Sequence, residues 1–340
     1  MHKIILLIII CSILFNNPAI VLASGNMNII NIKKTGNNKL EISWKKVSDQ
    51  DGYRVYRASE YNGTYTLVKD TKDDKFIDNV SIGNGYYYKI KSYKKEDGKV
   101  ILSNFSFIKR GSINANGVPA SIPATKIGSL KINGKQVIIV SVDKANNTTA
   151  NVSFYMKDKN GQWILDFSTI GYIGKNGIGK TKEGDNKTPI GLFNFIAAFG
   201  VASKPGNAKV PYVKVNETHW LVSDSNSKYY NRFVSTSKSK DGYSQTQEVV
   251  KDWDASYGEQ LYNYPKAYKY SLILNYNPGN VPHKGSAIFL HCYTNNKYTA
   301  GCVAIPESKM KYLLQKLDVN SQNKIAASII IDTADNILSY

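Results

Sequence analysis

The pattern of apolar and polar positions divides the chain into two parts. From about residue 27 to residue 111, short runs alternate apolar and polar side chains, as half-buried β-strands do; the clearest are residues 40–44, 53–56 and 86–92. The dipeptides Asp51-Gly52, Asn62-Gly63 and Asp97-Gly98 punctuate these runs and are typical of tight turns. We therefore expect a compact domain of strands over residues 27–111.

The second part, residues 127–340, has more continuous apolar runs, which predict more deeply buried strands at residues 136–142, 151–156, 287–290 and 303–305. Clear helical periodicity occurs near the end, at residues 307–317, where Met310, Leu313, Leu314 and Leu317 share one face. Residues 112–126, between the two parts, are rich in small and polar residues and in Pro, which predicts a linker with few contacts across it. The expected fold class is mainly β, with few helices.

The first 24 residues are expected to be a secretory signal peptide. Lys3 precedes an apolar stretch, and Val21-Leu22-Ala23 resembles a cleavage site with small residues. The stretch is too short to span a membrane and is followed by the helix-breaking Asn16-Asn17-Pro18. No later segment is long and apolar enough to cross a bilayer. These features predict a secreted protein that acts at the extracellular face.

The formal net charge of +18 indicates a polyanionic neighbourhood. The basic residues are spread along the chain without a dense basic run or a nucleic-acid-binding module, so nucleic acid is not the expected partner. Anionic wall polymers fit a secreted protein better. A lineage whose proteins are rich in Lys, Asn and Ile would explain the charge equally well.

A histidine and a cysteine eleven positions apart are the strongest candidates for chemistry. His291 ends an apolar run, and Cys302 follows Gly301 after a polar loop at residues 294–297. A strand–loop–strand unit can bring both side chains to one end of a sheet, where an imidazole takes the thiol proton and lowers the thiol pKa. We predict that Cys302 is a nucleophile and that His291 is its proton donor and acceptor.

The other thiol and imidazole groups have less specific surroundings. Cys292 should point away from the site by strand alternation, as a small buried hydrophobe; a disulfide with Cys302 is the less favoured alternative. His219 is expected to be structural or at the surface, and His283 to contact substrate. A zinc site made of His283, His291 and Cys302 would lack a close-spaced pair of ligands, so neither a metal nor an organic cofactor is expected.

Residues 288–306 resemble the catalytic signature of the YkuD-type L,D-transpeptidases, which remodel bacterial peptidoglycan with a cysteine nucleophile. His291 matches the upstream histidine of that signature, Thr299 its Ser/Thr, Gly301 its glycine and Cys302 its nucleophile. Ala300 stands where the family usually has a second histidine, and the loop before Thr299 is shorter than usual. A divergent branch carries this Thr-Ala-Gly-Cys-Val-Ala form. Three further segments resemble the same branch, at residues 184–193, 223–231 and 268–276.

The resemblance implies an acyl transfer on peptidoglycan stem peptides. Cys302 would attack the carbonyl after the L-centre of a diamino acid in a tetrapeptide and expel D-alanine, with Gly301, Thr299 and His283 near the oxyanion or the substrate. An amine would resolve the thioester to a 3–3 cross-link, whereas water would give L,D-carboxypeptidase action. A catalytically silent wall-binding protein and a secreted papain-like protease remain alternatives, although the latter has cysteine before histidine in its sequence.

The first part of the chain resembles a fibronectin type III domain. Trp44 falls on its second strand, Tyr53 and Val55 on the third, and Tyr86 at the tyrosine corner. The resemblance implies a β-sandwich that serves as a spacer or weak wall adhesin, with these aromatic residues in its core rather than on a sugar-binding surface.

Overall fold

A computed structural model describes residues 29–236 and 257–340. The predicted signal peptide lies outside the described residues. The fold is mainly β, as predicted, with a single α-helix, α1 (Glu307–Lys316), among the described residues. No helix in this part of the chain has both the length and the apolar character needed to cross a membrane.

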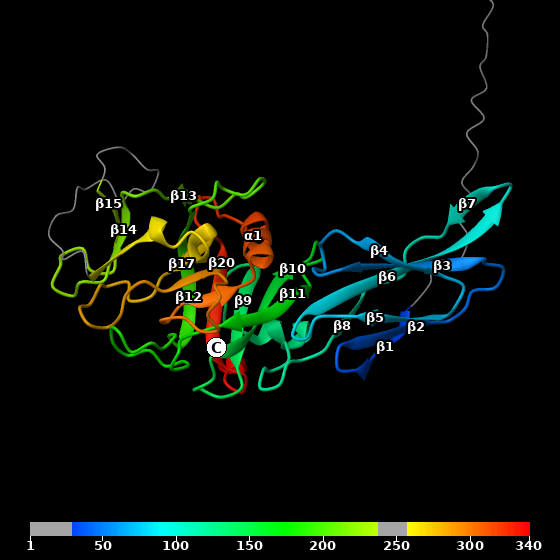
Figure 1. Cartoon of the computed structure of the whole chain (residues 1–340), viewed down its shortest axis with the longest axis horizontal. Coiled ribbons are helices and arrows are strands. Elements are labelled where there is room, and N and C mark those ends of the chain that lie inside the picture. The colour runs from blue at the N-terminus through cyan, green and yellow to red at the C-terminus, as the bar shows by residue number, and fades with distance from the viewer. Residues whose placement is uncertain (1–28, 237–256) are drawn as a thin grey trace, which may run out of the picture.

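The N-terminal domain is a sandwich of two sheets (Figure 1). One sheet has the strand order β1-β2-β5, and the other has the order β4-β3-β6-β7, with β8 paired to β6. The strands are β1 (Ile29–Gly36), β2 (Lys39–Trp44), β3 (Gly52–Ala58), β4 (Thr66–Thr71), β5 (Lys75–Asn79), β6 (Gly85–Glu96), β7 (Lys99–Leu102) and β8 (Lys109–Ser112).

Alternation along these strands builds the sandwich core. In β2 every second side chain is buried, and Trp44 meets Tyr53 of β3 edge to face at 5.6 Å between ring centroids. The Tyr86 hydroxyl accepts a hydrogen bond from the Ser81 N–H at 3.1 Å, which is the backbone contact expected of a tyrosine corner. Asp97 and Gly98 both have positive φ between β6 and β7, as a tight hairpin turn of two residues requires.

The C-terminal domain is built on a sheet of nine strands that closes on itself. The order is β13-β12-β17-β18-β19-β11-β10-β9-β20, and a further pairing of β12 with β20 completes a barrel that leaves β13 outside the ring. The strands are β9 (Gln136–Val142), β10 (Thr149–Lys157), β11 (Trp163–Tyr172), β12 (Gly191–Gly200), β13 (Tyr212–Lys214), β17 (Ser271–Leu274), β18 (Phe289–Cys292), β19 (Val303–Ile305) and β20 (Ala327–Thr333).

Much of the barrel wall is covered on both faces, which explains the continuous apolar runs of strands such as β9. Every residue of β9 is buried. Ile138 and Val140 point into the main core together with Leu313 of α1, whereas Val137 and Ile139 pack outward under the 3₁₀ turn Ala124–Ser129 and the C-terminus. Elsewhere a small sheet packs on the outer face of the wall around Leu221 and Phe289. Its strands are β14 (His219–Val222), β15 (Phe233–Ser235) and β16 (Gly258–Gln260).

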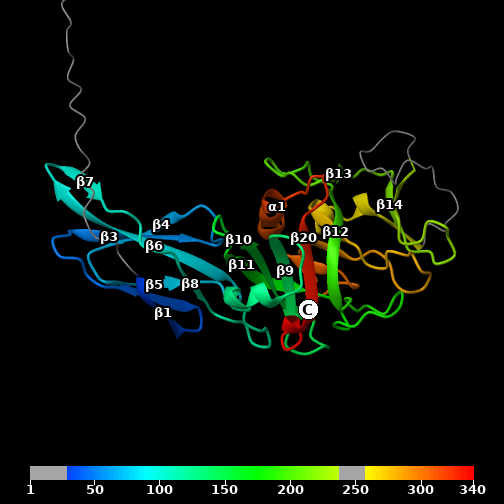
Figure 2. The ribbon, with the colours of Figure 1, turned by 180° about the vertical axis from the view of Figure 1, so that it is seen from behind.

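The two domains are in close contact, contrary to the expectation of few contacts between them. The tip of the sandwich lies against β11, where the Tyr61 N–H donates to the Asp166 carbonyl at 2.7 Å and Arg110 donates to Ser168 Oγ at 2.6 Å (Figure 2). Lys309 of α1 forms an ion pair with Glu60 at 2.6 Å, and both side chains are largely buried. Polar side chains thus hold the domains together where the composition of the connecting segment gave no signal.

The segment 112–126 is itself packed rather than free. Ile113 is buried in the sandwich core, and Ile122 packs against the outer face of the barrel. The Tyr155 hydroxyl donates to the Ile122 carbonyl at 2.7 Å, and Ser153 Oγ lies 2.9 Å from Ser121 Oγ. A few apolar residues among Gly, Ser and Pro are enough to bind the segment to both domains.

Candidate active site

The histidine side chain is placed by strand alternation in β18. Leu290 and Cys292 point into the barrel core, whereas Phe289 belongs to the cluster on the outer face, and His291 lies on that same outer side. Cys292 is a free, fully buried thiol, and its Sγ donates to the Tyr270 carbonyl at 3.5 Å. Strand β18 runs parallel to β19, and His291 is paired with Ala304, two residues after Cys302.

The turn before β19 can accommodate only glycine. Gly301 has φ of +146°, and a Cβ atom there would lie 2.9 Å from the Lys187 carbonyl oxygen. The Gly301 N–H donates to Thr299 Oγ1 at 3.1 Å, and Thr299 Oγ1 donates to the Cys302 carbonyl at 2.6 Å. The Thr299 hydroxyl thus closes the turn that presents Cys302.

The segment 184–193, noted in the sequence, supports this turn through its Lys187-Thr188-Pro189 run. Thr188 Oγ1 donates to the Cys302 carbonyl at 3.3 Å and accepts a hydrogen bond from the Gly174 N–H at 2.8 Å. Gly174 also forms a β-bridge with Thr299. The glycine-rich stretch around residue 174 is therefore part of the scaffold behind the cysteine.

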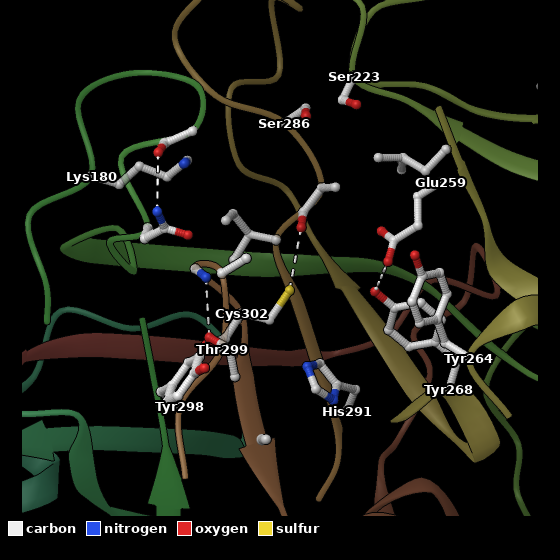
Figure 3. Close-up of a pocket in the computed structure, with 18 of the residues that line it drawn as sticks. Lys180, Ser223, Glu259, Tyr264, Tyr268, Ser286, His291, Tyr298, Thr299 and Cys302 are labelled. Carbon is white, nitrogen blue, oxygen red and sulfur yellow. Dashed lines mark hydrogen bonds between the residues drawn. The ribbon is translucent and has the colours of Figure 1, made fainter. Parts of the chain in front are cut away.

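His291 and Cys302 face the same pocket, but the thiol is not bonded to the imidazole (Figure 3). Cys302 Sγ donates to the Ala287 carbonyl at 3.4 Å and accepts a hydrogen bond from the Phe289 N–H at 3.3 Å. His291 Nδ1 lies 2.9 Å from the Cys292 carbonyl, so it carries the proton and leaves Nε2 as the basic nitrogen. A rotation of the thiol away from Ala287 is needed before Nε2 can accept its proton.

Burial keeps both groups neutral at physiological pH. It lowers the pKa of His291 to about 4 and raises the pKa of Cys302 to about 12. The prediction that the imidazole would lower the thiol pKa is therefore wrong for this arrangement, because desolvation of the thiolate outweighs the hydrogen bond from Phe289. The resting pair is a neutral thiol beside a neutral base.

The pocket has a volume of about 440 Å³ and lies between the barrel wall and the small sheet. Among the described residues that line it, one is a lysine: Lys180 is paired with Asp185 at 3.0 Å, and both side chains are almost fully buried. Glu259 of β16 accepts a hydrogen bond from the Tyr268 hydroxyl at 2.7 Å, and the Tyr268 ring meets the His291 ring edge to face at 5.5 Å between centroids. A carboxyl group is thus connected to the imidazole through one tyrosine.

The structure brings most of the predicted site residues together. Thr299, Gly301 and Ala300 line the pocket with His291 and Cys302. His283 does not: it is exposed, with φ of +64°, in a turn outside the pocket lining, so the three donors of the zinc alternative are not assembled. No group of potential metal ligands occurs among the described residues.

Other predicted positions have structural roles or lie apart from the site. His219 is buried in β14 against Phe233, where its Nδ1 contacts Asn216. Tyr298 lines the pocket, but Tyr229 and Tyr262 do not. Glu259 and Tyr268 line it as well. Tyr268 begins the segment 268–276 noted in the sequence, whereas Glu259 was missed because no motif marks a single acid on a short strand.

The chain matches the model of one protein family. Residues 135–331, more than half of the chain, match the model of the L,D-transpeptidase catalytic domain, YkuD. No curated protein matches the chain.

Among solved structures, the chain is similar to a β-1,2-glucanase from Parabacteroides distasonis at 21% identity, covering 27% of this chain and 13% of that one, with a TM-score of 0.22. It is similar to the sixth fibronectin type III domain of human fibronectin type III domain containing protein 3 at 12% identity, covering 28% and 92%, with a TM-score of 0.23. A segment of two fibronectin type III domains from chicken tenascin matches at 17% identity, covering 43% and 81%, with a TM-score of 0.22.

The YkuD match spans the barrel strands, the Lys-Thr-Pro segment and the turn that carries Cys302. Members of this family are acyltransferases with a cysteine nucleophile, and their domain implies a peptidoglycan substrate. The chain belongs to the YkuD family of L,D-transpeptidases.

Proposed function

We propose that the protein is a secreted L,D-transpeptidase that forms 3–3 cross-links between peptidoglycan stems through a thioester on Cys302. The observation that carries this proposal is the neutral thiol of Cys302 in the same pocket as the free Nε2 of His291. A neutral base can take the thiol proton as the sulfur attacks, which avoids forming a desolvated thiolate beforehand.

In the acylation step, Sγ bonds to the carbonyl carbon that follows the L-centre of the diamino acid. His291 takes the thiol proton and delivers it to the departing nitrogen, so D-alanine leaves as a neutral amine and His291 returns to its neutral form. The Gly301 N–H is already bonded to Thr299 Oγ1. We therefore assign the stabilisation of the oxyanion to the backbone N–H of Cys302.

In the second step an amine of another stem attacks the thioester, which gives the cross-link and restores the thiol. Hydrolysis by water at the same stage is the alternative outcome and would make the protein an L,D-carboxypeptidase. Ala300 is exposed at the mouth of the pocket, so the place of the family's usual second histidine is open to an acceptor stem.

The sandwich is proposed to hold the enzyme on the wall. On one of its faces, Lys89 lies 3.9 Å and Lys91 4.4 Å from the centre of the Phe105 ring, and neither lysine forms an ion pair among the described residues. Two ammonium groups without counter-charges support an interaction with anionic wall polymers.

Intact mass spectrometry of the mature protein incubated with a disaccharide-tetrapeptide tests the proposal. The expected result is an adduct with the mass of the donor less D-alanine on the wild type, and none on Cys302→Ala. A folded wild-type protein that never forms the adduct would favour the silent wall-binding alternative.

A further inference from the structure

Among the described residues that line the active-site pocket, carboxyl groups outnumber amino groups, although the chain as a whole is strongly basic. The formal net charge is +18, yet the pocket's lysine is neutralised by Asp185, while Glu259 has no ion-pair partner among the described residues. The second pocket carboxylate, Glu183, accepts a hydrogen bond from the buried Tyr230 hydroxyl at 2.6 Å. The unpaired acid of Glu259 therefore lies where a substrate cation can enter.

We propose that Glu259 binds the ammonium group of the acceptor stem and removes one of its protons, so that the amine can attack the thioester. This inference rests on the proposed function and deepens it, since it assigns a residue to the choice between cross-linking and hydrolysis.

The position of Glu259 follows from two contacts. Tyr268 donates its hydroxyl hydrogen to Glu259 Oε1 at 2.7 Å, and its ring meets the His291 ring edge to face at 5.5 Å between centroids. His291 serves the nitrogen that leaves in the first step, and by microscopic reversibility the attacking nitrogen arrives at the same place. Glu259 is thus on the side of the pocket where the acceptor amine must be.

The proton count requires a second base. An alkyl ammonium must lose two protons before it becomes an amide nitrogen. His291 takes one of them during attack and passes it to the sulfur as the C–S bond breaks. It is too weak a base to take the other from an ammonium ion, because burial lowers its pKa to about 4. Burial raises the pKa of the Glu259 carboxyl above its usual range, which favours its taking the first proton.

The step is balanced without further reactants. The ammonium and the Glu259 carboxylate become an amine and a carboxylic acid; the C–N bond then forms and the C–S bond breaks, and the acid later returns its proton to solvent. Water is uncharged and has no such first proton to lose. Hydrolysis of the thioester therefore does not depend on Glu259.

The test compares Glu259→Gln with the wild type and with Glu183→Gln, which removes a negative charge from the same pocket. Thioester formation is followed by intact mass, and dimers and tripeptides are separated by chromatography at pH 7.5. For Glu259→Gln we expect acylation within about twofold of the wild type and a ratio of 3–3 dimer to tripeptide at least about tenfold lower. Glu183→Gln should keep the wild-type ratio.

Two further measurements separate proton removal from a structural role. Hydroxylamine, which is uncharged at neutral pH, should resolve the Glu259→Gln thioester as fast as that of the wild type. Raising the pH toward the pKa of the free acceptor amine should restore dimer formation by Glu259→Gln. A wild-type dimer ratio in Glu259→Gln, equal loss of dimer and hydroxylamine product, or loss of acylation would each overturn the inference. A wild type that forms no thioester would instead reject the proposed function.

Discussion

The sandwich and the barrel bury their strands in different ways. A sandwich strand such as β2 has one buried face and one face toward solvent, whereas β9 and β18 of the barrel are buried along their whole length. In the sandwich, charged and aromatic side chains therefore gather on an open surface. In the barrel, reactive groups sit between the wall and a covering layer, where burial sets their protonation. Removing a polar side chain should therefore change stability or activity more in the barrel than in the sandwich.

The largest expected effect is on turnover, and it should distinguish the two cysteines, Cys302 in the pocket and Cys292 in the barrel core. Cys302→Ala should reduce turnover by at least about 10³-fold with little change in stability, because Sγ forms the bond to substrate. Cys292→Ala should keep turnover and cost about 1 kcal/mol, because it removes a buried sulfur from the core. Turnover and thermal unfolding of both variants check this, and activity in Cys302→Ala would assign the chemistry elsewhere.

His291→Gln should lower turnover by about 10²–10⁴-fold, because it removes the proton acceptor. His283→Ala is the control, since His283 is exposed outside the pocket, and it should change turnover little. If His283 proved indispensable instead, the assignment of the base would be wrong.

The pH profile of the wild type tests the burial of His291 directly. The base works only when neutral, so its contribution to kcat/KM should fall below pH 4 rather than near the ordinary histidine value of about 6.5. The stability of the fold depends on the same group. His291 is protonated at a higher pH in the unfolded chain than in the folded one, so the free energy of unfolding should fall by roughly 3 kcal/mol as the pH falls from about 6.5 to about 4. Circular dichroism at each pH separates unfolding from loss of the base.

A comparable effect on stability is expected where the two domains meet. Glu60→Ala should lower the free energy of unfolding by about 3–5 kcal/mol, because it leaves the Lys309 ammonium buried without a counter-charge. Lys33–Glu41 is the matched control on the sandwich surface, where Glu41→Ala should cost less than about 1 kcal/mol. Denaturant unfolding measures both. Equal, small losses would mean that the interface does not hold the domains together.

The smallest expected effect belongs to the sandwich surface. The double variant Lys89→Gln, Lys91→Gln should weaken retention on isolated walls by about fivefold and leave acylation unchanged. Co-sedimentation at low and high salt checks this. If retention changed neither in the double variant nor with salt, anionic wall polymers would not be the partner of this surface.

Local sequence patterns predicted individual strands and the helix well, because these elements depend on residues that are close together in the chain. Residues 136–142 and 303–305 are strands as predicted, and the helix covers residues 307–316 of the predicted 307–317. The closure of β12 on β20 could not be predicted, because those strands are more than a hundred residues apart and each is apolar on both faces. Periodicity cannot name a strand's partner when it has no polar face.

The candidate pair, His291 and Cys302, could be placed in one pocket from the sequence because its residue types are rare and lie close together in the chain. The protonation of the pair could not be predicted, because it depends on burial by distant segments that include Tyr268 and Phe289. Glu259 and the contact of Glu60 with Lys309 were missed for the same reason: single charged residues carry no pattern, and only the folded chain shows which of them have lost contact with water.

The burial of the Cys302 thiol has a consequence for its durability outside the cell. Desolvation raises the pKa of the Cys302 thiol, so the resting thiol is protonated at pH 7. Oxidants and soft electrophiles attack the thiolate, so the free enzyme presents them with almost nothing to attack. A carbonyl compound held beside His291 meets a sulfur that loses its proton only as the bond forms. The enzyme should therefore survive oxidising surroundings that inactivate exposed, low-pKa cysteines, and acylating inhibitors that occupy the pocket should act where simple alkylating agents fail.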